Sequence, residues 1–197
     1  PAQLAKIVAS VDHLSGGRTI LGVGAGWHQP EFDGFSNWGT PGQRVTRTSE
    51  ALELITRLWT GEKVSFEGKA YNSDGAIISP VPTQKPFPPM WFGVRGPRML
   101  DLAARYADAW IPTNISPELY EDGLKKLREK RSELGINTSL KGALQNFDVY
   151  TESEPCVATI NSYAAAGCEY YGSIWSYPPD EMVSRIKWFS KEVMPNV

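Results

Sequence analysis

Residues 90–112 read MWFGVRGPRMLDLAARYADAWIP and pass from a strand to a helix and back to a strand. The apolar run Met90–Val94 predicts a buried strand, and Pro97 suits the first helical turn, where the N–H that proline lacks would have no partner. Apolar residues recur beyond it at helical spacing, at Leu100, Ala103, Ala104 and Ala107. A second apolar run over residues 110–112 predicts the next strand. The stretch therefore predicts a parallel βαβ unit.

The same alternation continues on both sides of this unit. Further strands are predicted over residues 20–24, 147–150 and 170–175. Further helices are predicted over residues 4–14, closed by Gly16-Gly17; 52–59; 117–134, capped by Ser116; 155–166; and 180–189, with Met182, Val183, Ile186 and Phe189 facing inward. Residues 29–42 predict a loop, and residues 60–89 predict an irregular insertion that contains a hairpin.

This alternation indicates an α/β fold, with two possible closures: an open doubly wound sheet or a barrel. The chain has about five predicted strands, whereas a complete barrel of this class has eight strands and about 250 residues. At 197 residues the chain fits one domain, and we expect a single domain over residues 1–197.

Composition argues against several classes of function. Twenty Lys and Arg against 22 Asp and Glu leave a formal net charge of -2, which favours neither nucleic acid nor an anionic membrane as partner. No apolar run is long enough to span a bilayer, and the first residues resemble no signal or transit peptide. Cys156 and Cys168 are too far apart for a CxxC pair, so we expect reduced, buried thiols in a cytoplasmic protein without a metal site.

The first candidate binding segment is Leu21–Trp27, which reads LGVGAGW. Glycines that follow a strand let the backbone approach a ligand closely, so the candidates for cofactor binding are Gly24, Ala25, Gly26 and Trp27. The dinucleotide fingerprint GxGxxG is a poor match, because Trp27 replaces the third glycine and a predicted loop follows. Taken alone, these glycines are better explained by close packing at a strand end.

The second candidate segment comprises Gly93, Val94, Arg95, Gly96 and Pro97, between a predicted strand and a predicted helix. The N-terminus of a helix presents N–H groups without partners and a partial positive charge, which suit a phosphate. In barrels, phosphate sites recur at the carboxyl ends of strands. A plain turn with solvated arginines is an equal alternative.

His28 and Glu31 are candidates for a substrate pocket, because they follow the first glycine segment. A histidine in a polar loop is more often solvated than catalytic. No Ser-His-Asp arrangement, paired carboxylates or metal-ligand spacing stands out, so no catalytic residue is assigned. This pattern fits chemistry carried out by a bound redox cofactor.

Together these segments resemble the luciferase-like monooxygenase superfamily. The matching pieces keep the family's order and spacing along nearly the whole chain: Leu4-Ala5-Lys6, Val11-Asp12, Leu14-Ser15, Gly17-Arg18, Leu21–Trp27, Glu31-Phe32, Arg47, Glu50-Ala51-Leu52, Leu58-Trp59, Phe66, Gly68, Pro80, Pro82, Gln84, Pro86, Pro88-Pro89, Gly93, Leu102–Trp110, Ala166-Gly167 and Glu192–Pro195.

The resemblance implies a TIM-like (β/α) barrel of the bacterial luciferase type, usually dimeric, that binds FMN or coenzyme F420 at the carboxyl ends of its strands. It implies that Gly93–Pro97 lies near the cofactor phosphate and that Gly24–Trp27 borders the cofactor or substrate pocket. The stretch Gly96-Pro97-Arg98-Met99-Leu100, followed by Leu102-Ala103, looks more like the F420-dependent branch, which includes methylenetetrahydromethanopterin reductase.

The family's first three strands have no counterpart in this sequence, so we expect an incomplete barrel with exposed strand edges. A missing N-terminal segment, another partner or a second copy in a homodimer would cover them. The leading expectation is an oxidoreductase that transfers a hydride between F420, or reduced flavin, and a small organic substrate. The alternative is a non-catalytic truncated homologue that binds a ligand or serves in assembly.

Overall fold

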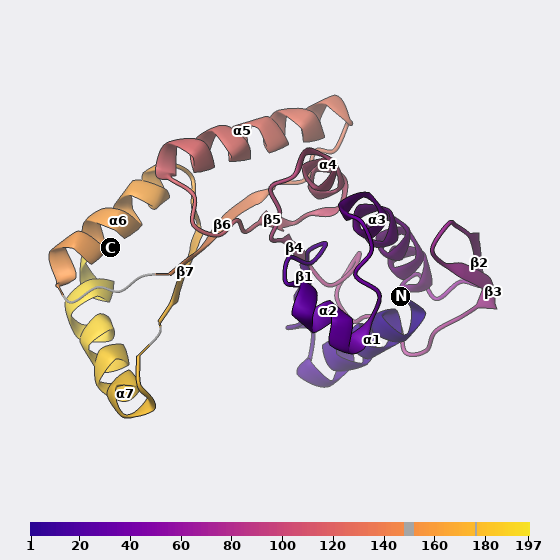
Figure 1. The fold of residues 1–197 in the computed structure, drawn as a ribbon, viewed down its shortest axis with the longest axis horizontal. Coiled ribbons are helices and arrows are strands. Elements are labelled where there is room, and N and C mark those ends of the chain that lie inside the picture. Colours follow the sequence, from indigo (N-terminus) through magenta and orange to yellow (C-terminus); the bar gives the residue numbers. More distant parts are fainter. Residues whose placement is uncertain (148–151, 176) are drawn as a thin grey trace. The chain divides into compact units, whose positions relative to one another are not determined.

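The computed structural model describes residues 1–147, 152–175 and 177–197. Its elements fall into two compact units, Pro1–Asp108 and Ala109–Val197 (Figure 1). The first unit contains α1 (Ala2–Ser15), β1 (Leu21–Val23), α2 (Gln29–Phe35), α3 (Pro41–Leu58), β2 (Val64–Glu67), β3 (Asn72–Ala76), β4 (Met90–Phe92) and α4 (Pro97–Tyr106). The second contains β5 (Ala109–Trp110), α5 (Pro117–Glu133), β6 (Lys141–Phe147), α6 (Ser153–Ala165), β7 (Tyr170–Ile174), α7 (Pro179–Trp188) and two short helical turns, η1 (Phe189–Val193) and η2 (Met194–Asn196).

Strands β1 and β4 of the first unit are parallel neighbours, and Val23 stands opposite Phe92. Asp108, just after α4, fixes the start of β4 through two bonds. Its backbone N–H donates to the Met90 carbonyl at 2.9 Å, and its Oδ2 accepts from the Met90 N–H at 2.8 Å. Because β1 and β4 are parallel, their carboxyl ends lie at the same edge of the sheet, as predicted.

Helices α1 and α3 pack together in the first unit, and the indole N–H of Trp59 donates to the Ala5 carbonyl at 3.0 Å. The buried side chains of α3 are Leu52, Leu54, Ile55 and Leu58. The helix predicted over residues 4–14 is confirmed by α1, whose buried face is formed by Ala5, Val8, Ala9 and Asp12. The larger side chains Leu4, Ile7, Val11 and Leu14 are exposed.

Asp12 connects α1 to the segment that leads into β4. Its buried carboxylate accepts hydrogen bonds from the backbone N–H groups of Thr83 and Gln84 at 2.8 and 2.9 Å, and from Gln84 Nε2 at 2.7 Å. Gln84 Nε2 also donates to the Thr19 carbonyl, just before β1. Burial opposes ionisation of Asp12, but these bonds outweigh it and lower the pKa of the carboxyl below its ordinary value.

The segment between β1 and α3 corrects one prediction. Residues 29–42 were predicted to form a loop, but residues 29–35 form α2 and α3 already begins at Pro41. Thr40 and Gln43 explain the early start of α3, because they form a reciprocal capping box. The predicted hairpin is confirmed, since β2 and β3 pair antiparallel beside α3 (Figure 1).

In the second unit β5, β6 and β7 form parallel pairs. The predicted cap of α5 is confirmed, since Ser116 Oγ accepts the Leu119 N–H at 3.4 Å. Tyr120 on α5 stacks on Trp110 with ring centroids 5.5 Å apart. Gly142 on β6 has no room for a side chain, because a methyl group would clash with the Gly167 carbonyl oxygen and with Tyr120.

The strand predicted over residues 147–150 falls almost entirely outside the described residues, and the described strand of this region is β6, over residues 141–147. The inward face predicted for the last helix is wrong for Val183 and Ile186, whereas Met182 and Phe189 are partly buried and the Phe189 ring centroid lies 5.2 Å from that of Trp175. No residue of α7 is buried, and Val183 and Ile186 are more than half exposed, because no described part of the chain covers this face.

The thiol prediction holds in part. Both cysteines are free, but only Cys156 is buried, and Cys168 is partly exposed. No helix among the described residues is long and apolar enough to cross a membrane.

Candidate functional site

The two predicted glycine segments meet at the carboxyl ends of β1 and β4. Gly24 follows β1 and Gly93 follows β4, and the Gly93 N–H donates to the Val23 carbonyl at 3.0 Å. A methyl group placed on Gly24 would lie 3.8 Å from the Gly93 carbonyl oxygen. The two backbones therefore run side by side without side chains between them.

These strand ends open into a cavity of about 430 Å³. It is lined by Met99 and by seven of the nine residues predicted to bind cofactor, which are Gly24, Ala25, Gly26, Trp27, Gly93, Val94 and Arg95. The other two, Gly96 and Pro97, follow directly as the N-cap and first residue of α4. The structure thus brings the two predicted segments into one place.

Gly26 shapes the wall that the segment after β1 contributes to this cavity. Its φ of +82° lies in the left-handed region, and a methyl group there would clash with the Phe32 ring on α2. The ring can pack on the turn only because residue 26 lacks a side chain. Beyond this turn the Trp27 side chain is 86% exposed, and its ring centroid lies 5.0 Å from that of His28.

The start of α4 forms the second wall. The side chains of Thr40 and Ser116 cap α3 and α5, whereas Gly96 provides no side-chain cap for α4. A methyl group on Gly96 would meet no other atom within 4 Å. The start of α4 therefore combines open space with the positive end of a helix dipole, and both favour an anionic group.

His28 and Glu31 are not brought into this cavity. Their side chains approach each other at 3.6 Å between Nδ1 and Oε1; that of His28 is partly exposed and that of Glu31 is exposed. Neither belongs to the residues that line the cavity. A place in the substrate pocket remains a prediction for both.

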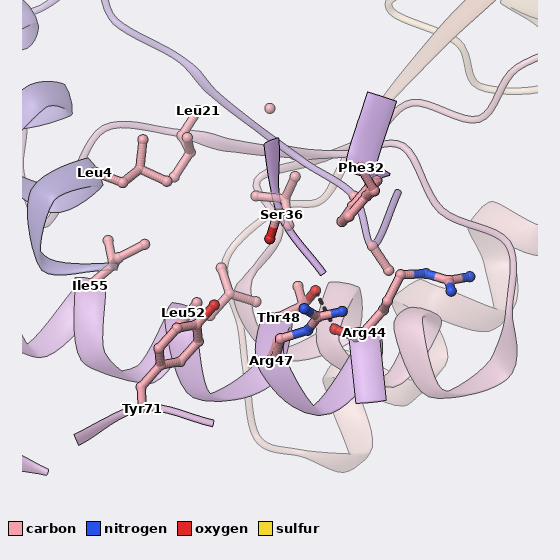
Figure 2. A pocket seen from close by; sticks show the side chains of 15 residues that line it. Leu4, Leu21, Phe32, Ser36, Arg44, Arg47, Thr48, Leu52, Ile55 and Tyr71 are labelled. Atoms are coloured by element: carbon pink, nitrogen blue, oxygen red, sulfur yellow. Dashed lines mark hydrogen bonds between the residues drawn. The ribbon is translucent and has the colours of Figure 1, made fainter. Parts of the chain in front are cut away.

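A second cavity of the first unit was missed by sequence reasoning (Figure 2). It has a volume of about 240 Å³ and lies between β1, α1, α2 and α3. Leu4, Leu21 and Ile55 gather on one side of it, and Phe32 and Arg44 lie on the other (Figure 2). It is thus an apolar cavity with cationic side chains at one end.

Two arginines of α3 line this second cavity. The Arg44 guanidinium lies 3.5 Å from the ring centroid of Trp38 and donates to the Gly39 carbonyl, but its buried Nε has no partner within the described residues. Arg47 donates to the carbonyls of Asn37 and Trp38 at 2.6 and 2.7 Å. The spacing of two arginines three residues apart on one helix face was visible in the sequence, but their partners were not.

The sequence model of the luciferase-like monooxygenase family matches residues 1–193. The chain belongs to the luciferase-like monooxygenase family. The resemblance drawn from the sequence is thereby confirmed.

A curated relative within this luciferase-like family is an F420-dependent glucose-6-phosphate dehydrogenase of Nakamurella multipartita. It is 38% identical over 150 residues, which are 72% of this chain and 44% of the dehydrogenase. The chain therefore spans less than half the length of that relative.

Two solved structures show the fold of this luciferase-like chain. An F420-dependent secondary alcohol dehydrogenase, in complex with an F420-acetone adduct, matches with a TM-score of 0.84 and 21% identity, over 100% of this chain and 75% of the other. A coenzyme F420 dependent tetrahydromethanopterin reductase of Methanopyrus kandleri matches with a TM-score of 0.77 and 19% identity, over 99% of this chain and 79% of the other. The prediction of an incomplete TIM-like barrel with about five strands is confirmed.

Proposed function

We propose that this chain forms the cofactor-binding part of an oxidoreductase that transfers a hydride between coenzyme F420 and a small organic substrate. The observation that carries the proposal is the cavity at the carboxyl ends of β1 and β4, with the uncapped start of α4 beside it. The names of the relatives support F420, since the dehydrogenase and both solved structures are described as F420-dependent or as holding F420. FMN is the alternative cofactor.

The residues present fit a planar cofactor that carries a phosphate. Gly24 and Gly93 leave the strand ends free of side chains, and Gly96 leaves open space at the α4 N-terminus for the phosphate oxygens. Arg95 adds a positive charge on the cavity wall. These groups bind and orient the cofactor.

F420 or a flavin supplies the hydride chemistry when bound, and the chain supplies position and exclusion of water. The described residues that line this cavity include no carboxylate, histidine or other proton-transferring side chain. We therefore expect any acid or base of the reaction to come from outside this cavity.

Titration of the purified chain with F420 and with FMN, followed by fluorescence and equilibrium dialysis, tests the proposal. Saturable binding of F420 that excludes FMN is the expected result. Binding of FMN but not of F420 would show that FMN is the cofactor of this chain. Binding of neither, by a folded chain, would favour the non-catalytic ligand-binding or assembly protein.

We also propose that further polypeptide covers the first unit. Within the described part of the chain β1 pairs only with β4, so its other edge is open. The exposed apolar residues of α1 (Leu4, Ile7, Val11 and Leu14) mark a face that would gain from burial. A segment before Pro1 in a longer protein is the occupant that we favour, and a second copy in a homodimer is the alternative.

A further inference from the structure

A third cavity of the first unit, of about 580 Å³, lies beside the start of α4. Its walls come from the loop before α3, the first turns of α3, the turn between β2 and β3, and α4. Gly39 and Gly42 contribute no side chains to these walls, which keeps the cavity wide.

Three cations from three different elements line this cavity: Arg47 on α3, Lys69 in the hairpin turn and Arg98 on α4. None of the described residues that line it is acidic. Arg47 is held in place by its two short bonds to backbone carbonyls. Within the described residues, the hydrogen bonds of Arg98 are both long, at 3.5 Å to the Gly42 carbonyl and to Thr46 Oγ1. They leave its guanidinium able to bind a stronger acceptor.

Glu50 on α3 is a carboxylate close to Lys69, and the positive charge of Lys69 helps to lower the pKa of Glu50. Glu50 accepts hydrogen bonds from the backbone N–H groups of Lys69, Ala70 and Tyr71 at 2.8 to 3.1 Å. Three amides of the hairpin turn therefore hold the Glu50 carboxylate, which offsets part of the Lys69 charge but does not line the cavity. The Lys69 side chain itself is exposed.

We propose that this cavity binds the oligoglutamate tail of F420, the chain of carboxylates attached beyond the cofactor's phosphate. The inference rests on the proposed function. Arg98 lies two residues after Gly96, so a chain that leaves a phosphate at the start of α4 meets Arg98 first and then Lys69 and Arg47 across the cavity. FMN ends at its phosphate, so this cavity discriminates between the two cofactors.

The test compares the affinity of the purified chain for three probes, by fluorescence titration: F420 with several glutamates, the same deazaflavin phosphate compound without glutamates, and FMN. We expect the glutamate-bearing form to bind about tenfold more tightly than the form without glutamates at roughly 0.01 M salt, and this advantage to shrink at about 0.15 M. Equal affinity for both F420 forms would overturn the inference and leave the proposed function standing. Binding of neither form would overturn both.

Substitutions in the cavity test whether its cations cause the tighter binding of the glutamate-bearing form. Arg98→Gln and Lys69→Gln should each reduce the advantage of the glutamate-bearing form by about threefold, without changing the affinity for the form that lacks glutamates. Lys6→Gln removes the same charge from an exposed position on α1 that lines none of the three cavities, so it should retain the full advantage. An undiminished advantage in both cavity variants would contradict the inference.

Discussion

Gly96 stands at the N-cap of α4, with open space where a side chain would project. An aspartate there would place a carboxylate where the proposed phosphate binds, and like charges repel. Because Asp is a favourable N-cap residue, Gly96→Asp should leave α4 as stable as before. We expect its affinity for F420 to fall at least tenfold, about 1.4 kcal/mol, by fluorescence titration, with an unchanged unfolding midpoint.

Gly96→Ala is the matched control for this substitution. Its φ of -66° suits any residue, and the added methyl group meets no atom within 4 Å. Its affinity should stay within a few-fold of the wild type. If Gly96→Asp binds F420 as tightly as the wild type, the phosphate does not bind at the start of α4.

Gly26 makes a separate prediction about stability. Gly26→Ala forces an L-residue into the left-handed region and drives its methyl group against Phe32, so we expect a loss of about 2 kcal/mol in unfolding free energy. Chemical denaturation measures it. Gly22→Ala, where a methyl group meets nothing within 4 Å, should cost much less. A similar cost for both would show that the turn tolerates a side chain.

At the scale of single residues, the sequence predicted the glycine segments because they stand directly after apolar runs. It could not predict Arg44, whose surroundings are set by Trp38 and Gly39, in a loop whose conformation is not encoded by any short pattern. For His28 and Glu31 the sequence predicted a place in the substrate pocket, but the structure does not bring them into the cavity. They follow the right strand, but α2 carries Glu31 and the pair faces solvent.

Among the elements, α1 depends on Asp12 for its connection to the segment before β4. Asp12→Asn replaces one carboxylate oxygen with an NH₂ group, which cannot accept from Thr83 or Gln84. We expect it to lower the free energy of unfolding by about 2 kcal/mol at neutral pH, measured by denaturant titration. Asp33→Asn, at an exposed position on α2, should change it little.

The same carboxylate predicts a pH dependence. The folded pKa of Asp12 lies below its ordinary value of 3.8, so its contribution to stability is present above that value and is lost as pH falls through the folded pKa. The difference in stability between wild type and Asp12→Asn should therefore narrow as the solution is acidified below about pH 4. A constant difference would show that ionisation of Asp12 is not what stabilises the contact.

The existence of most elements was predictable, because helical spacing and short apolar runs are local signals. Helix α2 was not, since its seven residues include Pro30 and Gly34 and resemble a loop. The spacing that predicts α1 does not show which of its faces is buried. Small residues pack closely against α3, and the larger apolar residues point to surface that no described segment covers.

On the scale of the whole molecule, the exposed stripe of α1 predicts an association. Ile7 is 58% exposed, so Ile7→Glu should leave the unfolding midpoint of this chain unchanged. It should weaken association with a separately expressed N-terminal segment of a longer form by at least tenfold in a pull-down or titration. If instead Ile7→Glu turns a dimer of the isolated chain into a monomer in sedimentation velocity, the occupant is a second copy.

The α/β class and the count of about five parallel strands could be predicted because each βαβ unit is local and its crossover has one favoured form. The choice between an open sheet and a barrel could not be made from spacing, since both use the same units. The resemblance to the luciferase-like family predicted the barrel, and the fold shared with the solved structures confirms that prediction.

Trp27 stands on the wall of the proposed cofactor cavity with most of its indole open to water. An indole so close to a deazaflavin would pass its excitation energy to that ring, so the protein carries its own optical reporter of occupancy. Six other tryptophans also emit, so the difference in emission loss between the wild type and Trp27→Phe would time the arrival of the coenzyme, without a label and before any substrate is known.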